Sequence, residues 1–300
     1  MTQETPADNM GNSPLIFDRD LVRAHRERAA AHFTTFLAEE VADRLIERLS
    51  EIKRDFKRIL IIGDAGGKLA THIAARYQAE ILVRMDFSKT MLQKSSGPRV
   101  QASEEFIPFE PASFDLIIGN LTLHWVNDLP GTLIQLNRTL KPDGLFLAAF
   151  FGGTTLTELR QALANAEVAV TNGLSPRVSP FADIRDCGGL LQRAGFALPL
   201  VDSDTITVTY GNALSLMRDL RGMGETNALV LRPKTPTRRD IILAAAEAYS
   251  DLFARDDGRL PATFQIFFLT AWAPDASQPK PLRPGSGKVS LAEALKPSNS

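Results

Sequence analysis

A run of small residues between a predicted strand and a predicted helix constrains this chain more than any other feature. The apolar run Arg58–Ile62 leads directly into Gly63-Asp64-Ala65-Gly66-Gly67, and apolar residues at helical spacing follow. Small residues let a ligand approach the backbone, and the first turn of a helix offers unpaired N–H groups. In an open parallel sheet, the carboxyl end of a strand borders the usual ligand crevice. The pattern therefore predicts an α/β fold with a ligand site at residues 63–67.

Three kinds of nucleotide-binding loop use segments of this type. A phosphate-binding P-loop is excluded, because Ile62 replaces its first glycine and Leu69 replaces its serine or threonine. A dinucleotide loop is disfavoured, because Lys68 replaces its third glycine. The pattern G-x-G/A-x-G of an S-adenosylmethionine-binding loop is matched by Gly63, Ala65 and Gly67. A glycine turn with a purely structural role is the alternative.

A carboxylate ends the next predicted strand. The apolar run at 81–85 stops at Asp86, 19 residues after Gly67. A carboxylate at this place can accept hydrogen bonds from both hydroxyls of a ribose. We therefore favour a ribose-bearing ligand over the alternative, a solvated loop aspartate.

Predicted strands and helices alternate along the rest of the chain. We expect strands at 58–62, 81–85, 114–119, 145–150, 199–209 and 263–272, and helices at 33–49, 69–77, 130–140, 157–170 and 183–194. Asp128 is predicted to cap the helix at 130–140, and Lys141-Pro142-Asp143-Gly144 to form a turn. This alternation predicts right-handed βαβ units and a mostly parallel sheet.

The chain is predicted to form one domain at 15–273, with its core at 55–150 and a helical insertion at about 212–254 before the last strand. Residues 1–14 are polar and predicted to be disordered. Residues 274–300 contain several prolines and glycines, which predict an extended tail.

Composition excludes several function classes. The 34 Lys and Arg residues balance 35 Asp and Glu residues, so no overall field favours nucleic acid or an anionic membrane. Cys187 is the only cysteine and the four histidines are not at metal-ligand spacing, so neither a disulfide nor a metal site is predicted. No apolar stretch reaches the roughly 20 residues of a membrane helix. The N-terminus carries acidic residues and no apolar run, so we expect a cytoplasmic protein without a signal or transit peptide.

Further segments resemble the motifs of class I S-adenosylmethionine-dependent methyltransferases. They lie at 85–92, 106–109, 113–117 and 140–144. The resemblance implies a Rossmann-like fold, with a mostly parallel seven-stranded sheet covered by helices on both faces, and S-adenosylmethionine as cofactor. The chain departs from the family pattern at Ile61 and Ala65. It also has Ser103 where an acidic residue usually reads the adenine, with Glu104 beside it as a replacement acceptor.

A narrower resemblance covers almost the whole chain. Residues 123–130 are similar to a segment shared by the malonyl-carrier-protein methyltransferase of biotin synthesis and the assembly factors of respiratory complex I. Segments that resemble the assembly factors alone lie at 16–19, 151–156, 217–227, 261–266 and 277–281. The resemblance implies an enzyme that hydroxylates an arginine of a complex I subunit, and so a protein substrate and transient contact with a membrane complex.

The candidate site residues fall into two groups. The cofactor side is predicted to comprise Gly63, Ala65, Gly67, Asp86, Phe87, Ser103, Glu104 and Asn120. The substrate side is predicted to comprise His124, Trp125, Arg221 and Glu225. His124 would serve as a base or hydrogen-bond donor and Trp125 as an apolar wall, while Glu225 would pair with an arginine substrate bidentately. For each group a structural role stays open: a packed pair beneath the next helix for His124 and Trp125, and a solvated helix face for Arg221 and Glu225.

Three functions are therefore compatible with the sequence. The first is an S-adenosylmethionine-binding enzyme that acts on a complex I subunit by arginine hydroxylation or methylation. The second is methylation of a small-molecule or carrier-bound carboxylate, for which a basic patch near the site is expected because carrier proteins are acidic. The third is a non-catalytic assembly chaperone, which the departures at Ile61 and Ser103 suggest.

Overall fold

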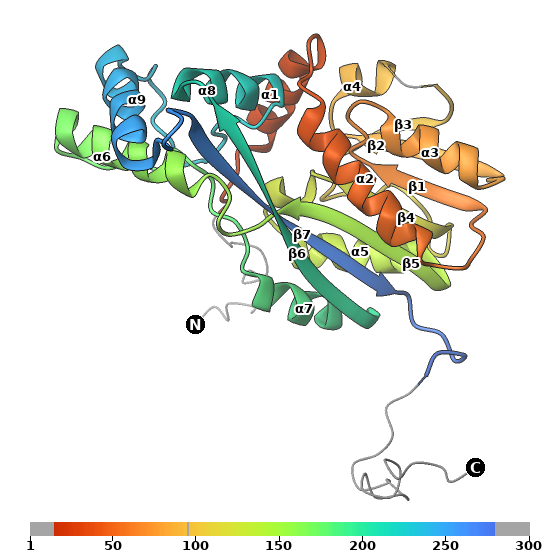
Figure 1. The fold of residues 1–300 in the computed structure, drawn as a ribbon. Helices are drawn as coiled ribbons and strands as arrows, with labels where there is room; N and C mark the ends of the chain where they lie inside the picture. Colours follow the sequence, from red (N-terminus) through yellow and green to blue (C-terminus); the bar gives the residue numbers. More distant parts are fainter. Residues whose placement is uncertain (1–14, 95, 280–300) are drawn as a thin grey trace, which may run out of the picture.

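A single seven-stranded sheet organises the computed structural model, which describes residues 15–94 and 96–279 (Figure 1). Its order is β3-β2-β1-β4-β5-β7-β6. The strands are β1 Arg58–Ile62, β2 Ile81–Asp86, β3 Arg99–Gln101, β4 Phe114–Asn120, β5 Leu140–Phe151, β6 Ala197–Tyr210 and β7 Leu260–Trp272. Strands β1 to β5 pair in parallel, and β7 lies antiparallel between β5 and β6. The predicted mostly parallel, seven-stranded fold is confirmed.

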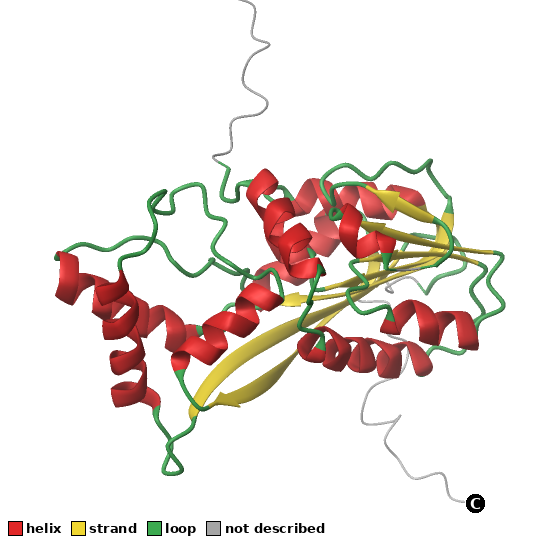
Figure 2. Ribbon diagram, turned by 90° about the horizontal axis from the view of Figure 1, so that it is seen from above, coloured by secondary structure: helices red, strands yellow, loops and turns green. Residues whose placement is uncertain are grey.

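Helices cover both faces of this sheet (Figures 1 and 2). They are α1 Arg19–Ala30, α2 Phe36–Ser50, α3 Lys68–Arg76, α4 Lys89–Gln93, α5 Leu129–Thr139, α6 Thr157–Thr171, α7 Ile184–Arg193, α8 Ala213–Gly222 and α9 Arg239–Phe253, with a 3-10 turn at Leu123–Trp125. Helices α2, α3, α6, α8 and α9 contribute to one apolar core, and α5 and α7 to the other. Among the described residues, no helix is long and apolar enough to cross a membrane.

The continuous apolar runs of the central strands follow from this burial on both faces. Ile59 and Ile61 point into one core, whereas Leu60 and Ile62 point into the other. All four side chains are fully buried. Ile61, a departure from the family pattern, is therefore a core residue of β1.

The helical insertion lies between β6 and β7, where it was expected. It consists of α8 and α9, joined by residues 223–238. Helix α9 packs against α6, and both contact β7, so the two helices form a layer at one end of the sheet (Figure 2). The space between this layer, α1 and α8 is where the larger cavity opens.

One local prediction is wrong. Lys141-Pro142-Asp143-Gly144 belongs to β5, which begins at Leu140, and the predicted turn survives only as an irregularity with φ +57° at Asp143. Helix α1 was not predicted, because its sequence is rich in arginine and has few apolar residues to reveal a period. The predicted cap is confirmed: Asp128 accepts a hydrogen bond from the Gly131 N–H at 2.8 Å.

The segments predicted to be disordered, 1–14, and extended, 274–300, lie wholly or mostly outside the described residues.

Candidate functional site

The glycine loop follows β1 and leads into α3 with left-handed backbone at Gly63, Gly66 and Gly67, whose φ angles are +72°, +96° and +76°. A Cβ on Gly63 would overlap the side chain of Thr122, so close packing against the end of β4 requires this glycine. At Gly67 a Cβ would come no closer than 3.8 Å to another residue. The loop thus leaves its backbone accessible at Gly67, as a ligand site needs, and Ala65 is buried beneath it.

Two hydrogen-bond acceptors lie at the same edge of the sheet as this loop. Asp86 ends β2 and Asn120 ends β4. Because the parallel strands β1, β2 and β4 end at one edge, both residues lie near the loop, and both are buried. The Asn120 amide donates to the Ala38 carbonyl at 3.1 Å. Its Oδ1 is buried and has no hydrogen-bond partner within residues 15–94 and 96–279. The edge therefore holds a carboxylate and an orphaned amide oxygen.

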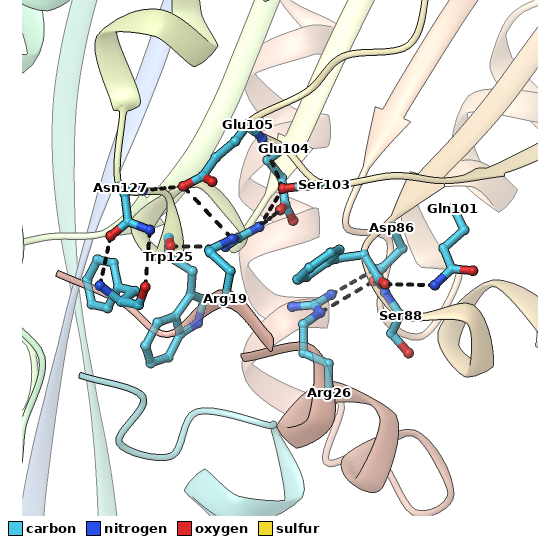
Figure 3. A network of polar contacts seen from close by, with 12 residues as sticks. Arg19, Arg26, Asp86, Ser88, Gln101, Ser103, Glu104, Glu105, Trp125 and Asn127 are labelled. Carbon is cyan, nitrogen blue, oxygen red and sulfur yellow. Dashed lines mark hydrogen bonds and ion pairs between the residues drawn. The ribbon is translucent and has the colours of Figure 1, made fainter. Parts of the chain in front are cut away.

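Helix α1 covers this edge and places Arg26 on Asp86 (Figure 3). The Arg26 Nη2 lies 2.7 Å from Asp86 Oδ2, and Nε lies 3.4 Å from Oδ1. The two side chains are only 5% and 4% exposed. Burial alone would lower the pKa of Arg26, but the Asp86 carboxylate raises it above its ordinary value. The carboxylate that was predicted to bind ribose is therefore occupied by Arg26 in a buried, two-point ion pair.

A second arginine of α1 gathers the other predicted cofactor residues. Arg19 forms an ion pair with Glu104 and donates to Ser103 Oγ at 3.2 Å. Its guanidinium lies over the Phe87 ring, 4.7 Å from the centroid. It also donates to the Trp125 carbonyl at 2.9 Å (Figure 3). Residues from three different loops, all predicted to belong to the site, thus lie together around the guanidinium of Arg19. Arg19 itself was not predicted to belong to the site.

The space left at this edge is small. The cavity beside Ala65 and Asn120, which Arg26 also lines, has a volume of about 20 Å³. That is room for roughly one water molecule. The acceptors and the open glycine backbone suit the hydroxyls and the ammonium group of S-adenosylmethionine, so the residues fit this cofactor in their chemistry. With α1 in place, this cavity is too small for a nucleoside.

Three of the four residues predicted for the substrate side, His124, Trp125 and Glu225, form a compact cluster although they lie far apart in the sequence. Glu225 Oε2 lies 3.1 Å from His124 Nε2 and accepts a hydrogen bond from Trp125 Nε1 at 3.0 Å. The His124 ring packs on Phe151, with centroids 4.6 Å apart. The Arg221 side chain lines the larger cavity but makes no hydrogen bond or ion pair with the described part of the chain. The roles of all four residues stay predictions.

A cavity of about 860 Å³ opens beside this cluster, between α1, α6, α8 and the loop before α9. Aromatic side chains form part of its wall: Trp125, Phe151, Phe181 and Phe264. Phe151 and Glu225 line both this cavity and the small one at the cofactor edge. They therefore form the partition at which a cofactor and a substrate would meet.

Sequence analysis missed Arg19 and Arg26, whose partners lie 85 and 60 residues away in the chain. The one available signal was the resemblance at 16–19, which lies at the start of α1. In the parts of the chain that the structure describes, no three His, Cys, Asp or Glu side chains lie close enough to hold a metal ion.

The Arg26–Asp86 pair predicts a large stability effect. We expect Asp86→Asn to lower the free energy of unfolding by about 3 kcal/mol, because it leaves a buried guanidinium without its counter-charge. Urea unfolding of the free protein measures this. Asp43→Asn removes an exposed partner of Lys68 and should cost less than about 1 kcal/mol. Equal effects of the two substitutions would contradict the assignment.

His25, on the wall of the large cavity, predicts a pH effect. Burial, and next the positive charge of Arg28, lower the pKa of His25 below its ordinary 6.5. The unfolded chain then binds a proton that the folded chain rejects, so stability falls as the pH drops below about 6.5. In urea unfolding at pH values of about 7.5 and 5.5, the wild type should lose more stability than His25→Asn. The exposed His32→Asn should behave like the wild type, and an equal loss in all three proteins would sink this interpretation.

Comparison with known proteins agrees with this geometry. Residues 60–148 match the family described as "Methyltransferase domain". The chain is 40% identical over 290 residues to the Danio rerio "Arginine-hydroxylase NDUFAF5, mitochondrial", covering 94% of this chain and 90% of that protein.

A second relative and a solved structure point the same way. The chain is 34% identical over 270 residues to a malonyl-[acyl-carrier protein] O-methyltransferase of Xylella fastidiosa, covering 86% and 89% of the two chains. In structure it resembles a Haemonchus contortus phosphoethanolamine N-methyltransferase crystallised with S-adenosylhomocysteine, with a TM-score of 0.51, 17% identity and coverage of 85% and 60%. The two methyltransferase matches support S-adenosylmethionine as the cofactor, and the solved structure shows a shared fold. The chain therefore belongs to the family of methyltransferase-fold proteins that includes the NDUFAF5 arginine-hydroxylases and the malonyl-[acyl-carrier protein] O-methyltransferases.

Proposed function

We propose that this chain is an S-adenosylmethionine-binding enzyme that modifies an arginine side chain of a protein subunit in respiratory complex I assembly. The name of the 40% identical relative supports the arginine substrate. The observation that carries the proposal is the position of Glu225 in the partition between the two cavities. Its Oε2 is engaged by His124 and Trp125, while Oε1 accepts no hydrogen bond from residues 15–94 and 96–279.

This free oxygen suits a guanidinium. An arginine side chain entering the large cavity would find a largely buried carboxylate that is fixed in orientation by two hydrogen bonds. Phe151 closes the partition beside it and excludes water. His124 donates its Nε2–H to Glu225, so the nitrogen that can accept a proton is Nδ1, which is buried and has no hydrogen-bond partner among the described residues. The residues thus orient an arginine at the side of the cavity nearest the cofactor edge.

The cofactor supplies an activated methyl group, so alignment of the acceptor accounts for most of the acceleration of methyl transfer. Hydroxylation instead requires an oxidant and a source of electrons. Asp86, Asn120 and the glycine loop would hold the cofactor in either case. We propose that the bound cofactor displaces the Arg26 guanidinium from Asp86, because the ribose hydroxyls and Arg26 would bind the same carboxylate.

Two other functions remain as alternatives. Methylation of a carrier-bound carboxylate is favoured by the basic residues on the large cavity, yet the charge of Glu225 would repel a malonyl carboxylate. A non-catalytic chaperone is favoured by the closure of Asp86 by Arg26. Subunit identity, and the cytoplasmic location expected from the sequence, stay predictions.

Intact-mass analysis of complex I subunits from a strain lacking this protein tests the function directly. Loss of about 16 Da from one subunit indicates hydroxylation, and loss of about 14 Da indicates methylation. Tandem mass spectrometry should place the missing group on an arginine. Unchanged subunit masses would contradict the proposed function.

Competition for Asp86 predicts that Arg26→Met binds S-adenosylmethionine more tightly than the wild type, by about tenfold, because no ion pair must be broken first. Calorimetric titration measures the affinity. Arg44→Met removes another ion-paired arginine, on α2 and away from the cofactor edge, and should leave the affinity unchanged. Weaker binding by Arg26→Met would show that Arg26 belongs to the bound form of the site.

Glu225→Gln is expected to reduce kcat/KM for an arginine substrate by about ten- to a hundredfold, because it removes the charge that a guanidinium meets. The amide keeps the size of the side chain, so calorimetric binding of S-adenosylmethionine should stay within about twofold of wild type. An unchanged kcat/KM would exclude Glu225 as the arginine-binding carboxylate.

A further inference from the structure

The mouth of the large cavity carries three basic side chains from three separate segments. Arg28 lies on α1, Arg221 on α8 and Lys234 in the loop before α9; we call them the mouth cations. Each lines the cavity and is also exposed, which places it at the opening. None of them forms a salt bridge with any residue in 15–94 or 96–279.

The other charges of the cavity are already partnered or lie deeper. Arg177 is held by Glu167 at 2.7 Å, and Arg232 by Asp18 at 3.1 Å. Among the described lining residues, Glu225 is the only carboxylate, and its side chain is 12% exposed. The cavity is therefore positive at its mouth and negative at its inner wall.

This arrangement does not follow from the overall charge, since the whole chain has a net charge of −1. Basic residues that share one concave surface reinforce one another, because the low-dielectric walls focus their field. His25 lies on the same wall, and its lowered pKa, caused by burial and then by Arg28 and Arg232, is consistent with a positive local field. A ligand that enters must cross a positive opening before it reaches Glu225.

We propose that the cavity selects an arginine that lies in an acidic segment of its protein substrate. Aspartate or glutamate side chains flanking the arginine would meet the mouth cations, while the guanidinium meets Glu225. The proposal rests on the proposed function, and adds to it the charge of the sequence around the modified arginine. It also explains how a basic opening admits a basic side chain: the flanking carboxylates offset the repulsion.

Fluorescence anisotropy with the full chain tests this. Three short labelled peptides share a central arginine and carry aspartate, glutamine or lysine at the flanking positions. We expect the acidic peptide to bind about tenfold more tightly than the neutral one, and the basic peptide most weakly. The advantage of the acidic peptide should shrink as salt is raised, because the mouth cations are exposed to solvent. Equal affinities for the acidic and neutral peptides would overturn the proposal.

A charge exchange identifies the residues responsible. In Arg221→Glu/Lys234→Glu the preference should invert, so that the basic peptide binds best. Arg218→Glu changes a basic residue of the same helix that does not line the cavity, and it should keep the wild-type preference. Thermal melting of each variant verifies that it is folded. An unchanged preference in the double variant would assign the selectivity elsewhere and overturn the proposal.

The central residue separates this proposal from the function on which it rests. Replacing the central arginine of the acidic peptide by glutamine should weaken binding to wild type but not further weaken binding to Glu225→Gln. If the glutamine peptide binds wild type as well as the arginine peptide does, the arginine assignment fails while the preference for acidic flanks stands. If an acidic acyl carrier protein displaces the acidic peptide and no arginine is required, the mouth cations serve a carrier protein and the present proposal is wrong.

Discussion

The buried ion pair between Arg26 and Asp86 is the interaction on which the arrangement of the site depends. Taking both charges out of water costs several kcal/mol each. The two contacts between Arg26 and Asp86, and the Ser88 N–H that donates to Asp86 Oδ1 at 2.7 Å, offset that cost. The pair fixes α1 against the ends of the central strands. Helix α1 thereby closes the cofactor edge on one side. Its opposite side forms part of the wall of the large cavity.

Helix α1 therefore belongs to both halves of the site. Arg19 and Arg26 face the cofactor edge, whereas Leu21, His25 and Arg28 line the large cavity. A movement of α1 that separates Arg26 from Asp86 would also move that lining, because the residues share one short helix. The two cavities meet at Glu225 and Phe151, so the fold provides both a common wall and a common cover for cofactor and substrate.

Much of the fold could be predicted because its signals are local. Apolar runs ending at Ile62 and Met85 mark two parallel strands of the sheet, and the glycines after Ile62 mark the turn from β1 into α3. The pattern also predicted which side chains gather at the cofactor edge, since parallel strands end together. The role of Gly63 could not be predicted, because it depends on contact with Thr122 across the sheet.

The polar network could not be predicted from sequence. Arg26 and Asp86 are 60 residues apart, and His124 and Glu225 are 101 apart, so only the folded chain shows that they pair. Arg221 and Glu225 were both predicted for the substrate side, and both line the large cavity, with Arg221 exposed at its mouth. The sequence pattern indicated in which part of the site these charged side chains lie, but their partners depend on the tertiary structure.

Hydrogen exchange across α1, with and without S-adenosylmethionine, tests the central claim most directly. If the cofactor takes the place of Arg26 at Asp86, the amides of residues 19–30 should exchange faster in its presence, while those of β1 and β4 stay protected. Slower or unchanged exchange in α1 on cofactor binding would show that the helix stays closed, and would contradict the competition of Arg26 and cofactor for one carboxylate.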